Sequence, residues 1–127
     1  MNHFNTTVKN DSIFNTLLSH AETVTDCRDH RHAAATVYKK KILAIGKNQM
    51  KTHPIMLQYQ TDSTKIYLHA EIDAIVKVIN VHGADILKHC SLYNLRLTGG
   101  GNVAMSKPCK GCQKAIDAFG IKKVFWT

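Results

Sequence analysis

Two segments decide the fold: HAEIDAIVKVINVHG at residues 69–83 and PCKGCQKAIDAFG at residues 108–120. The apolar residues of the first segment recur at helical spacing: Ile72, Ile75, Val76, Val78 and Ile79. Gly83 and Gly120 follow the two segments as stop signals. We therefore expect two helices, one that begins near His69 and one that begins after Pro108.

Short apolar runs around these helices predict strands. HAAATVY at residues 32–38 and ILAIG at residues 42–46 predict a hairpin, because the three lysines between them suit a turn in water. SLYNLRLT at residues 91–98 alternates as a strand does, and IKKVFWT at residues 121–127 predicts a last strand. SIFNTLLSHAETV at residues 12–24 has an apolar stripe at helical spacing and predicts a first helix.

The expected element order is αββαβαβ, with a weaker helical turn at residues 84–90 and loops at residues 47–65 and 99–107. Strands separated by helices require at least one parallel pairing, with helices packed on the faces of one sheet. The fold class is therefore α/β with a mixed central sheet. The last strand is expected to lie exposed at the sheet edge, which favours a homo-oligomer.

Length and composition fit one globular domain over residues 1–127. The chain has 127 residues, of which 44% are hydrophobic and 20% charged, so a disordered tail, a coiled coil or a fibrous repeat is excluded. No apolar run approaches the roughly 18 to 20 residues that cross a bilayer, and the N-terminus lacks the apolar core of a secretory signal. We expect no membrane association and a cytoplasmic location.

The formal net charge of +8 favours anionic partners, either phosphates or nucleic acid. The lysines are spread along the chain, however, and such charges are usually solvated faces. The charge alone leaves nucleic-acid binding open without favouring it.

The chemistry-bearing pattern is H-x-E at residues 69–71 and P-C-x-x-C at residues 108–112. One histidine and two cysteines are ligands that Zn²⁺ prefers, and three protein ligands leave the fourth tetrahedral position for water. Cys109 and Cys112 are three residues apart at a helix start, so both can face one ion. Glu71 is well placed to move protons between such a water and a substrate, which is the chemistry of hydrolytic deamination.

These motifs resemble the zinc-dependent cytidine deaminase superfamily, in particular its deoxycytidylate and related nucleotide deaminases, whose signature is H-x-E with P-C-x-x-C. The resemblance covers the chain from about residue 31 to residue 127 and implies a three-layer α/β/α sandwich. It also implies that His69, Cys109 and Cys112 bind one catalytic zinc ion and that Glu71 is the proton shuttle. The match of Asn48 implies contact with the sugar or base of the substrate.

Further substrate contacts are expected from Ala70 and Pro108, which adjoin the ligands, and from His53 and Arg31. His53 lies in a loop that is longer than in compact nucleoside deaminases, as do Lys47, Lys51 and Lys65, and Arg31 is a bidentate phosphate partner by type. An aromatic stacking partner for a base is sought first at Tyr59. The chain ends after the fourth expected strand, whereas most members of the family add a further helix and strand.

The resulting hypothesis is a zinc hydrolase that deaminates a cytosine nucleotide or nucleoside, with dCMP as the first choice. The alternatives are a deaminase of a base in single-stranded nucleic acid or tRNA, a deaminase of another free base, and a zinc-stabilised binding module without turnover. Cys27, His30 and His32 are candidates for a second metal site, but without a second cysteine pair a loop with a buried thiol is favoured.

Overall fold

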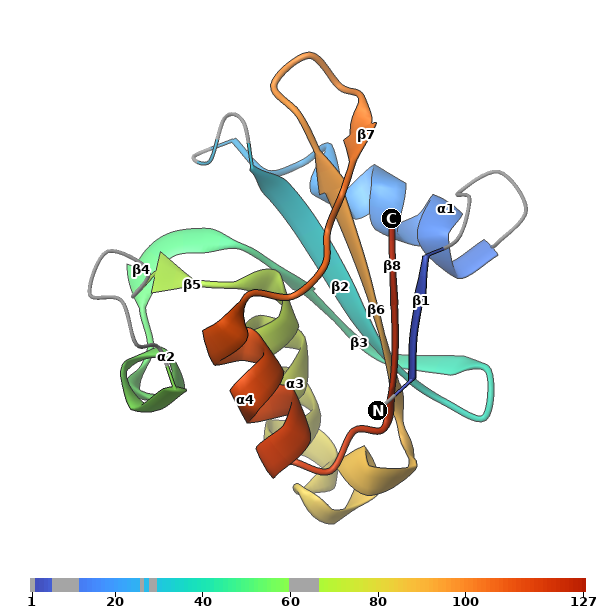
Figure 1. Cartoon of the computed structure of the whole chain (residues 1–127), viewed down its shortest axis with the longest axis vertical. Helices are drawn as coiled ribbons and strands as arrows, with labels where there is room; N and C mark the ends of the chain where they lie inside the picture. The colour runs from blue at the N-terminus through green and yellow to red at the C-terminus, as the bar shows by residue number, and fades with distance from the viewer. Residues whose placement is uncertain (1, 6–11, 26, 28–29, 60–66) are drawn as a thin grey trace.

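The structure is a computed structural model that describes residues 2–5, 12–25, 27, 30–59 and 67–127. Its centre is a six-stranded mixed sheet in the order β1-β8-β6-β2-β3, with β7 paired to β6 (Figure 1). The strands are β1 (Asn2–Asn5), β2 (Arg31–Tyr38), β3 (Lys41–Lys47), β6 (Ser91–Leu97), β7 (Val103–Ala104) and β8 (Lys123–Trp126). β8 runs parallel to both of its neighbours, whereas the pairings of β2 with β3 and β6 are antiparallel.

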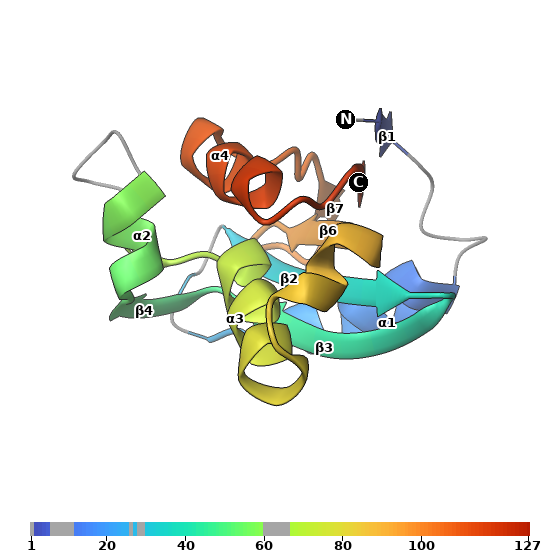
Figure 2. The ribbon, with the colours of Figure 1, turned by 90° about the horizontal axis from the view of Figure 1, so that it is seen from below.

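Helices cover both faces of the sheet, so the predicted three-layer arrangement is present (Figure 2). One face packs on α1 (Ser12–Ala21), and the other packs on α3 (Ala70–His82) and α4 (Lys110–Ala118). A hydrophobic core lies on each face of the sheet, and strand β2 contributes side chains to both. Ala33 and Ala35 pack with α1, whereas Ala34 packs with α3. The short 3-10 helix η3 (Asp85–His89) follows α3 at the predicted helical turn.

The sequence missed several short elements. The region predicted as one long loop contains β4 (Gln49–Thr52), α2 (Pro54–Tyr59) and β5 (Tyr67–Leu68), and β4 pairs with β5. Pro54 suits the first position of a helix, and His53 accepts hydrogen bonds from the first turn, from Ile55 N–H to Nδ1 and from Met56 N–H to its carbonyl. Strand β7 likewise lies within the predicted loop at residues 99–107.

The last strand is not the sheet edge, which corrects our expectation. β8 lies between β6 and β1, since the first residues of the chain pair with it in parallel from Asn2 with Lys123 to Asn5 with Trp126. The N-terminal stretch has no alternating apolar pattern that would have indicated a strand. The argument for oligomerisation from an exposed last strand is therefore lost.

The β2–β3 hairpin has the predicted lysine turn. Lys39 and Lys40 occupy its tip with φ of 48° and 65°, the left-handed conformation that two-residue turns between antiparallel strands require. Both side chains are exposed. The charged turn therefore lies in water as predicted.

Helix α3 lies directly on strand β3 because Gly46 has no side chain. A Cβ at Gly46 would be 2.3 Å from Ala74 N and 2.4 Å from Ala70 O. The buried Asp73 also joins α3 to β3, since one of its carboxylate oxygens accepts a hydrogen bond of 3.0 Å from the N–H of Lys47. These contacts fix the first turn of α3, where the H-x-E motif lies, against the sheet.

None of the helices in the described part of the chain has the length and apolar character needed to span a bilayer.

Candidate active site

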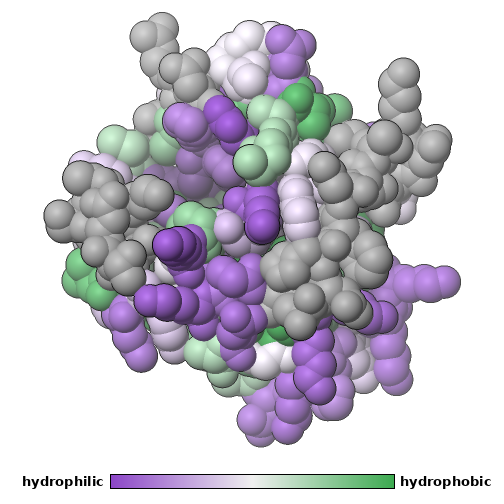
Figure 3. Space-filling model, viewed as in Figure 1, coloured by the Kyte–Doolittle hydropathy of each residue, from purple (hydrophilic) through white to green (hydrophobic). Residues whose placement is uncertain are grey.

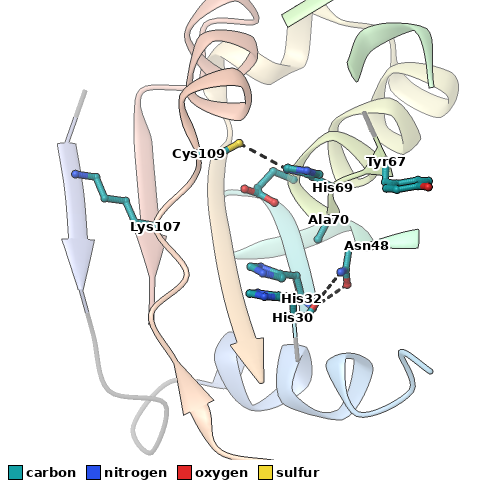
Figure 4. A pocket seen from close by; sticks show the side chains of 9 residues that line it. His30, His32, Asn48, Tyr67, His69, Ala70, Lys107 and Cys109 are labelled. Atoms are coloured by element: carbon teal, nitrogen blue, oxygen red, sulfur yellow. Dashed lines mark hydrogen bonds between the residues drawn. The ribbon is translucent and has the colours of Figure 1, made fainter. Parts of the chain in front are cut away.

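The first turns of α3 and α4 bring three metal-ligand types together. His69 and Cys109 occupy the N-cap positions of the two helices, and neither makes a side-chain capping hydrogen bond. Cys112 follows in the first turn of α4. The ligand atoms of His69, Cys109 and Cys112 lie within 4.8 Å of one another. The His69 Nδ1 atom is 3.1 Å from the Cys112 sulfur. It is 3.7 Å from the Cys109 sulfur, a contact that Figure 4 draws as a dashed line.

This donor set fits one zinc ion. One imidazole nitrogen and two thiols are borderline-to-soft donors, and three protein ligands leave one tetrahedral position open. The pKa of the Cys112 thiol is raised well above its ordinary value, first by its hydrogen bond with Cys109 and then by burial. Both thiols must lose their protons to bind zinc, so metal binding will release protons. Two helix N-termini favour the thiolates that result.

Glu71 is the carboxylate of this site. It lies in the first turn of α3, lines the same pocket as His69, and is only 4% exposed. Burial is the main cause that raises the pKa of this carboxyl, and the nearby His69 partly opposes the rise. A buried carboxyl with a raised pKa is suited to accept a proton and to donate it again.

The site opens into a pocket of about 470 Å³. Besides His69, Glu71 and Cys109, the pocket is lined by His30, His32, Asn48, Tyr67, Ala70 and Lys107 (Figure 4). The pocket is large enough for a base with its sugar. The buried acid, the metal-ligand group and a cavity therefore coincide in one place.

A family profile described as "Cytidine and deoxycytidylate deaminase zinc-binding region" matches residues 8–127. The chain belongs to this family. The resemblance inferred from H-x-E and P-C-x-x-C, the α/β fold class and the zinc cofactor are thereby confirmed.

Three of the solved structures with a similar fold are described below. Guanine deaminase from Bacillus subtilis superposes with a TM-score of 0.60 at 28% identity, over 89% of this chain and 60% of that one, so this chain spans less than two thirds of that protein. The apo dCMP deaminase from the cyanophage S-TIM5 has a TM-score of 0.60 at 26% identity, over 92% of this chain and 83% of that one. A mutant cytidine deaminase from Mycobacterium tuberculosis, at 18% identity and a TM-score of 0.53 over 92% of this chain and 86% of that one, shows a likeness of fold alone. A search of curated proteins finds no match.

Two of the predicted substrate residues of this deaminase-family chain line its pocket, Asn48 and Ala70. The side chain of Asn48 is already engaged with the start of β2. Its Oδ1 accepts a hydrogen bond of 2.8 Å from the N–H of His32, and its Nδ2 donates to the carbonyl of His30. Asn48 therefore fixes the backbone that carries two other pocket residues.

The other three predicted substrate residues lie outside the lining of this pocket. The imidazole of His53 accepts from the first turn of α2, and Pro108 lines a neighbouring hollow with Lys107, Lys110, Gln113 and Lys114. Arg31 donates through Nη2 to the carbonyl of Thr98 at 2.7 Å, which ties β2 to the end of β6. Of the loop lysines, Lys47 donates to the Thr23 hydroxyl, and Lys65 lies outside the described residues.

Sequence reasoning missed His30, His32, Tyr67 and Lys107 as pocket residues. Tyr67, 45% exposed, is the aromatic ring at the pocket, whereas Tyr59 packs on Phe119 of α4 with ring centroids 6.4 Å apart. The expectation of a stacking role for Tyr59 is thus wrong, because α2 forms where a loop was predicted. The sequence could have indicated Tyr67 and Lys107 by their position, because Tyr67 lies two residues before His69 and Lys107 lies two residues before Cys109.

A second metal site at Cys27, His30 and His32 is not formed among the described residues. In that part of the chain, the group that can hold a metal ion is His69, Cys109 and Cys112. His32 and His30 instead line the pocket that contains Glu71, and Cys27 lines an adjoining hollow.

Proposed function

We propose that the chain is a zinc-dependent hydrolytic deaminase of a cytosine nucleotide, with dCMP converted to dUMP and ammonia as the first choice. The observation that carries this proposal is the grouping of His69, Cys109 and Cys112 with the buried carboxyl of Glu71 in one pocket of about 470 Å³. A purely structural zinc site normally closes with four protein ligands and has no use for an adjacent acid.

His69, Cys109 and Cys112 would hold the ion, which supplies a Lewis acid that makes water nucleophilic at neutral pH when it is bound. Glu71 accepts a proton from the attacking water and delivers protons to the ring nitrogen and to the leaving amine. The carbon–oxygen bond forms at the amino-bearing ring carbon and the carbon–nitrogen bond breaks. One water is consumed, the amino group leaves as ammonia, and the base gains a carbonyl.

The lysines beside the pocket support a nucleotide over a nucleoside. Lys107 lines the pocket and also the hollow that Lys110 and Lys114 share on the outside of α4. Hydrophilic side chains gather over α4 on this face of the molecule (Figure 3). The Lys107 side chain points away from the other pocket residues (Figure 4), with its ammonium 5.9 Å from the centroid of the Trp126 ring. A phosphate attached to a sugar in the pocket would therefore meet this ammonium after a change of the Lys107 rotamer. The cyanophage protein, with which this chain shares 25% identity, was solved in complex with dCMP and dUMP.

The same lysines favour a second candidate, deamination of a base in single-stranded nucleic acid or tRNA. A strand whose reacting base enters the pocket would have further phosphates over Lys110 and Lys114, which are exposed. A free purine base is a third candidate, because the similarity to a guanine deaminase is of the same order as that to a dCMP deaminase.

Ammonia release and the ultraviolet change of the base test the proposal with zinc-loaded protein and cytidine, dCMP, guanine and a cytosine-containing oligonucleotide. We expect turnover of dCMP above that of deoxycytidine, and loss of turnover with zinc retained in Glu71→Gln. Unchanged activity and zinc content in Glu71→Gln would refute the catalytic assignment. Turnover of the oligonucleotide alone, falling steeply with salt, would establish the second candidate.

A homo-oligomer and a cytoplasmic location stay predictions. Light scattering coupled to size exclusion tests the first, and a monomer over the whole concentration range would contradict it.

A further inference from the structure

His32 lies on the sheet face that carries the site. Side chains alternate along β2, so His32 shares its face with Ala34, which packs against the α3 side, while Arg31 shares the opposite face with Ala33. The imidazole of His32 lines the pocket together with that of His30, and the two rings lie side by side (Figure 4). The N–H of His32 is held by Asn48 Oδ1. His32 is therefore a fixed part of the pocket wall.

The two ring nitrogens of His32 have different surroundings. Nδ1 is buried and has no hydrogen-bond partner among the described residues. Nε2 is not among the buried atoms without a partner, so the edge of the ring that carries it is the accessible one. An unpaired buried N–H costs more than an unpaired buried lone pair. The favoured tautomer therefore carries its proton on Nε2 and presents an N–H to the pocket.

The surroundings keep this imidazole neutral. Burial is the main cause that lowers the pKa of His32 to about 4. His69, Arg96 and His30 lower it further, and Cys109 alone opposes them. Arg96 is the cross-strand partner of His32 in the register of β2 and β6. A neutral donor does not suit a phosphate as well as an ammonium group does.

We propose that His32 is a specificity-determining residue that donates a hydrogen bond from Nε2 to an oxo group of the substrate base. The inference rests on the proposed deaminase function, because it needs the base to occupy the pocket with its amino-bearing carbon at Glu71 and the metal ligands. In a partly desolvated pocket, an uncharged hydrogen-bond donor discriminates against a base that has no acceptor for it, because the donor is then left unpaired. Cytosine and guanine carry an oxo group on the ring, whereas adenine carries none.

The test compares two ligands and three variants. The ligands are dUMP and the analogue in which hydrogen replaces the 2-oxo group, and binding to zinc-loaded protein is measured by calorimetry. His32→Phe keeps a planar ring but removes the donor, and His32→Gln keeps an N–H donor. His82→Phe changes an exposed histidine at the end of α3, away from the pocket, and is the control.

We expect His32→Phe to bind dUMP about tenfold more weakly than the natural chain, the typical effect of one hydrogen bond. The same variant should bind the analogue as the natural chain does, and His32→Gln should recover most of the affinity for dUMP. Zinc content should stay at one ion in every variant. Equal affinity of the natural chain and His32→Phe for dUMP, or an equal loss for both ligands, would overturn the inference.

Failure of the proposed function gives a different pattern. If the natural chain neither deaminates dCMP nor binds dUMP or guanine, the proposed function and this inference are both overturned. If it deaminates dCMP and His32→Phe binds dUMP unchanged, the function stands and the inference is overturned. Turnover of guanine in place of dCMP would overturn the proposed substrate, and a purine pair with and without the 6-oxo group then tests His32.

Discussion

Replacing Gly46 with alanine is expected to move helix α3, which carries Glu71. The added Cβ would lie 2.3 Å from Ala74 N and 2.4 Å from Ala70 O, and both atoms belong to the backbone of α3 rather than to a flexible side chain. Ordinary van der Waals contact begins near 3.4 Å, so β3 and α3 must separate by roughly 1 Å, which forfeits a quarter to a half of the dispersion energy at their contact. Overpacking of this kind costs about 1–3 kcal/mol or more.

The same shift displaces Glu71, which is next to Ala70 in the chain. Because a misplacement of about 1 Å can reduce turnover about a hundredfold, Gly46→Ala should lose far more activity than stability alone explains. Urea unfolding of zinc-loaded protein measures the free energy of unfolding, and initial rates at saturating substrate measure turnover. Gly100→Ala is the matched control, since a Cβ there would meet its nearest atom at 3.8 Å. If Gly46→Ala matched Gly100→Ala in both measurements, the reasoning that the close approach of α3 to β3 positions the site would be refuted.

Four further predictions follow from local features. Lys40→Gly should raise the free energy of unfolding by about 1 kcal/mol, because a φ of 65° strains a side-chain-bearing residue; a fall in urea midpoint would contradict this. Removing zinc with a chelator should lower the free energy of unfolding by about 4 kcal/mol, compared with protein in free zinc at a thousand times the dissociation constant. A melting temperature that calorimetry finds unchanged by the chelator would contradict a bound ion. Because folding lowers the pKa of His32 from 6.5 to about 4, the unfolded chain binds more protons in this window; stability should therefore fall by about 3 kcal/mol between pH 6.5 and pH 4, and His32→Phe should lose this component in urea titrations. Asn48→Ala should weaken dUMP binding about tenfold without loss of zinc, since it frees the start of β2; unchanged affinity in calorimetry would show that Asn48 is dispensable.

The main elements of the fold were predictable because their signals are local. Helix α3 follows from apolar spacing and Gly83, and the β2–β3 hairpin follows from two apolar runs with lysines between them. The strand β1 was not predictable, because it gains its stability from pairing with β8 at the other end of the chain. Long-range pairing of a polar stretch leaves no periodicity in the sequence to detect.

The metal group was predictable for the same local reason. Cys109 and Cys112 share one helical turn, and His69 stands at the start of another helix, so each half of the group is a short motif with its own chemistry. The wall of the pocket is different, since His30 and His32 belong to no motif and line the pocket only because of where β2 and the residue before it lie. Sequence reasoning selected Arg31 in their place for its chemical type, and the structure turns Arg31 to the carbonyl of Thr98.

The choice between Arg31 and His32 shows where the sequence lacks information. A strand with one face in water shows alternating polar and apolar residues, and that contrast would have told which of two adjacent residues points to the site. Strand β2 is covered by helices on both faces, so five consecutive residues from Ala33 to Val37 are buried and the contrast disappears. The packing of Ala34 supplies the missing information about which face is which. Once Ala34 is known to pack on the α3 side, the two-residue repeat of the strand places His32 in the pocket wall and Arg31 on the opposite face.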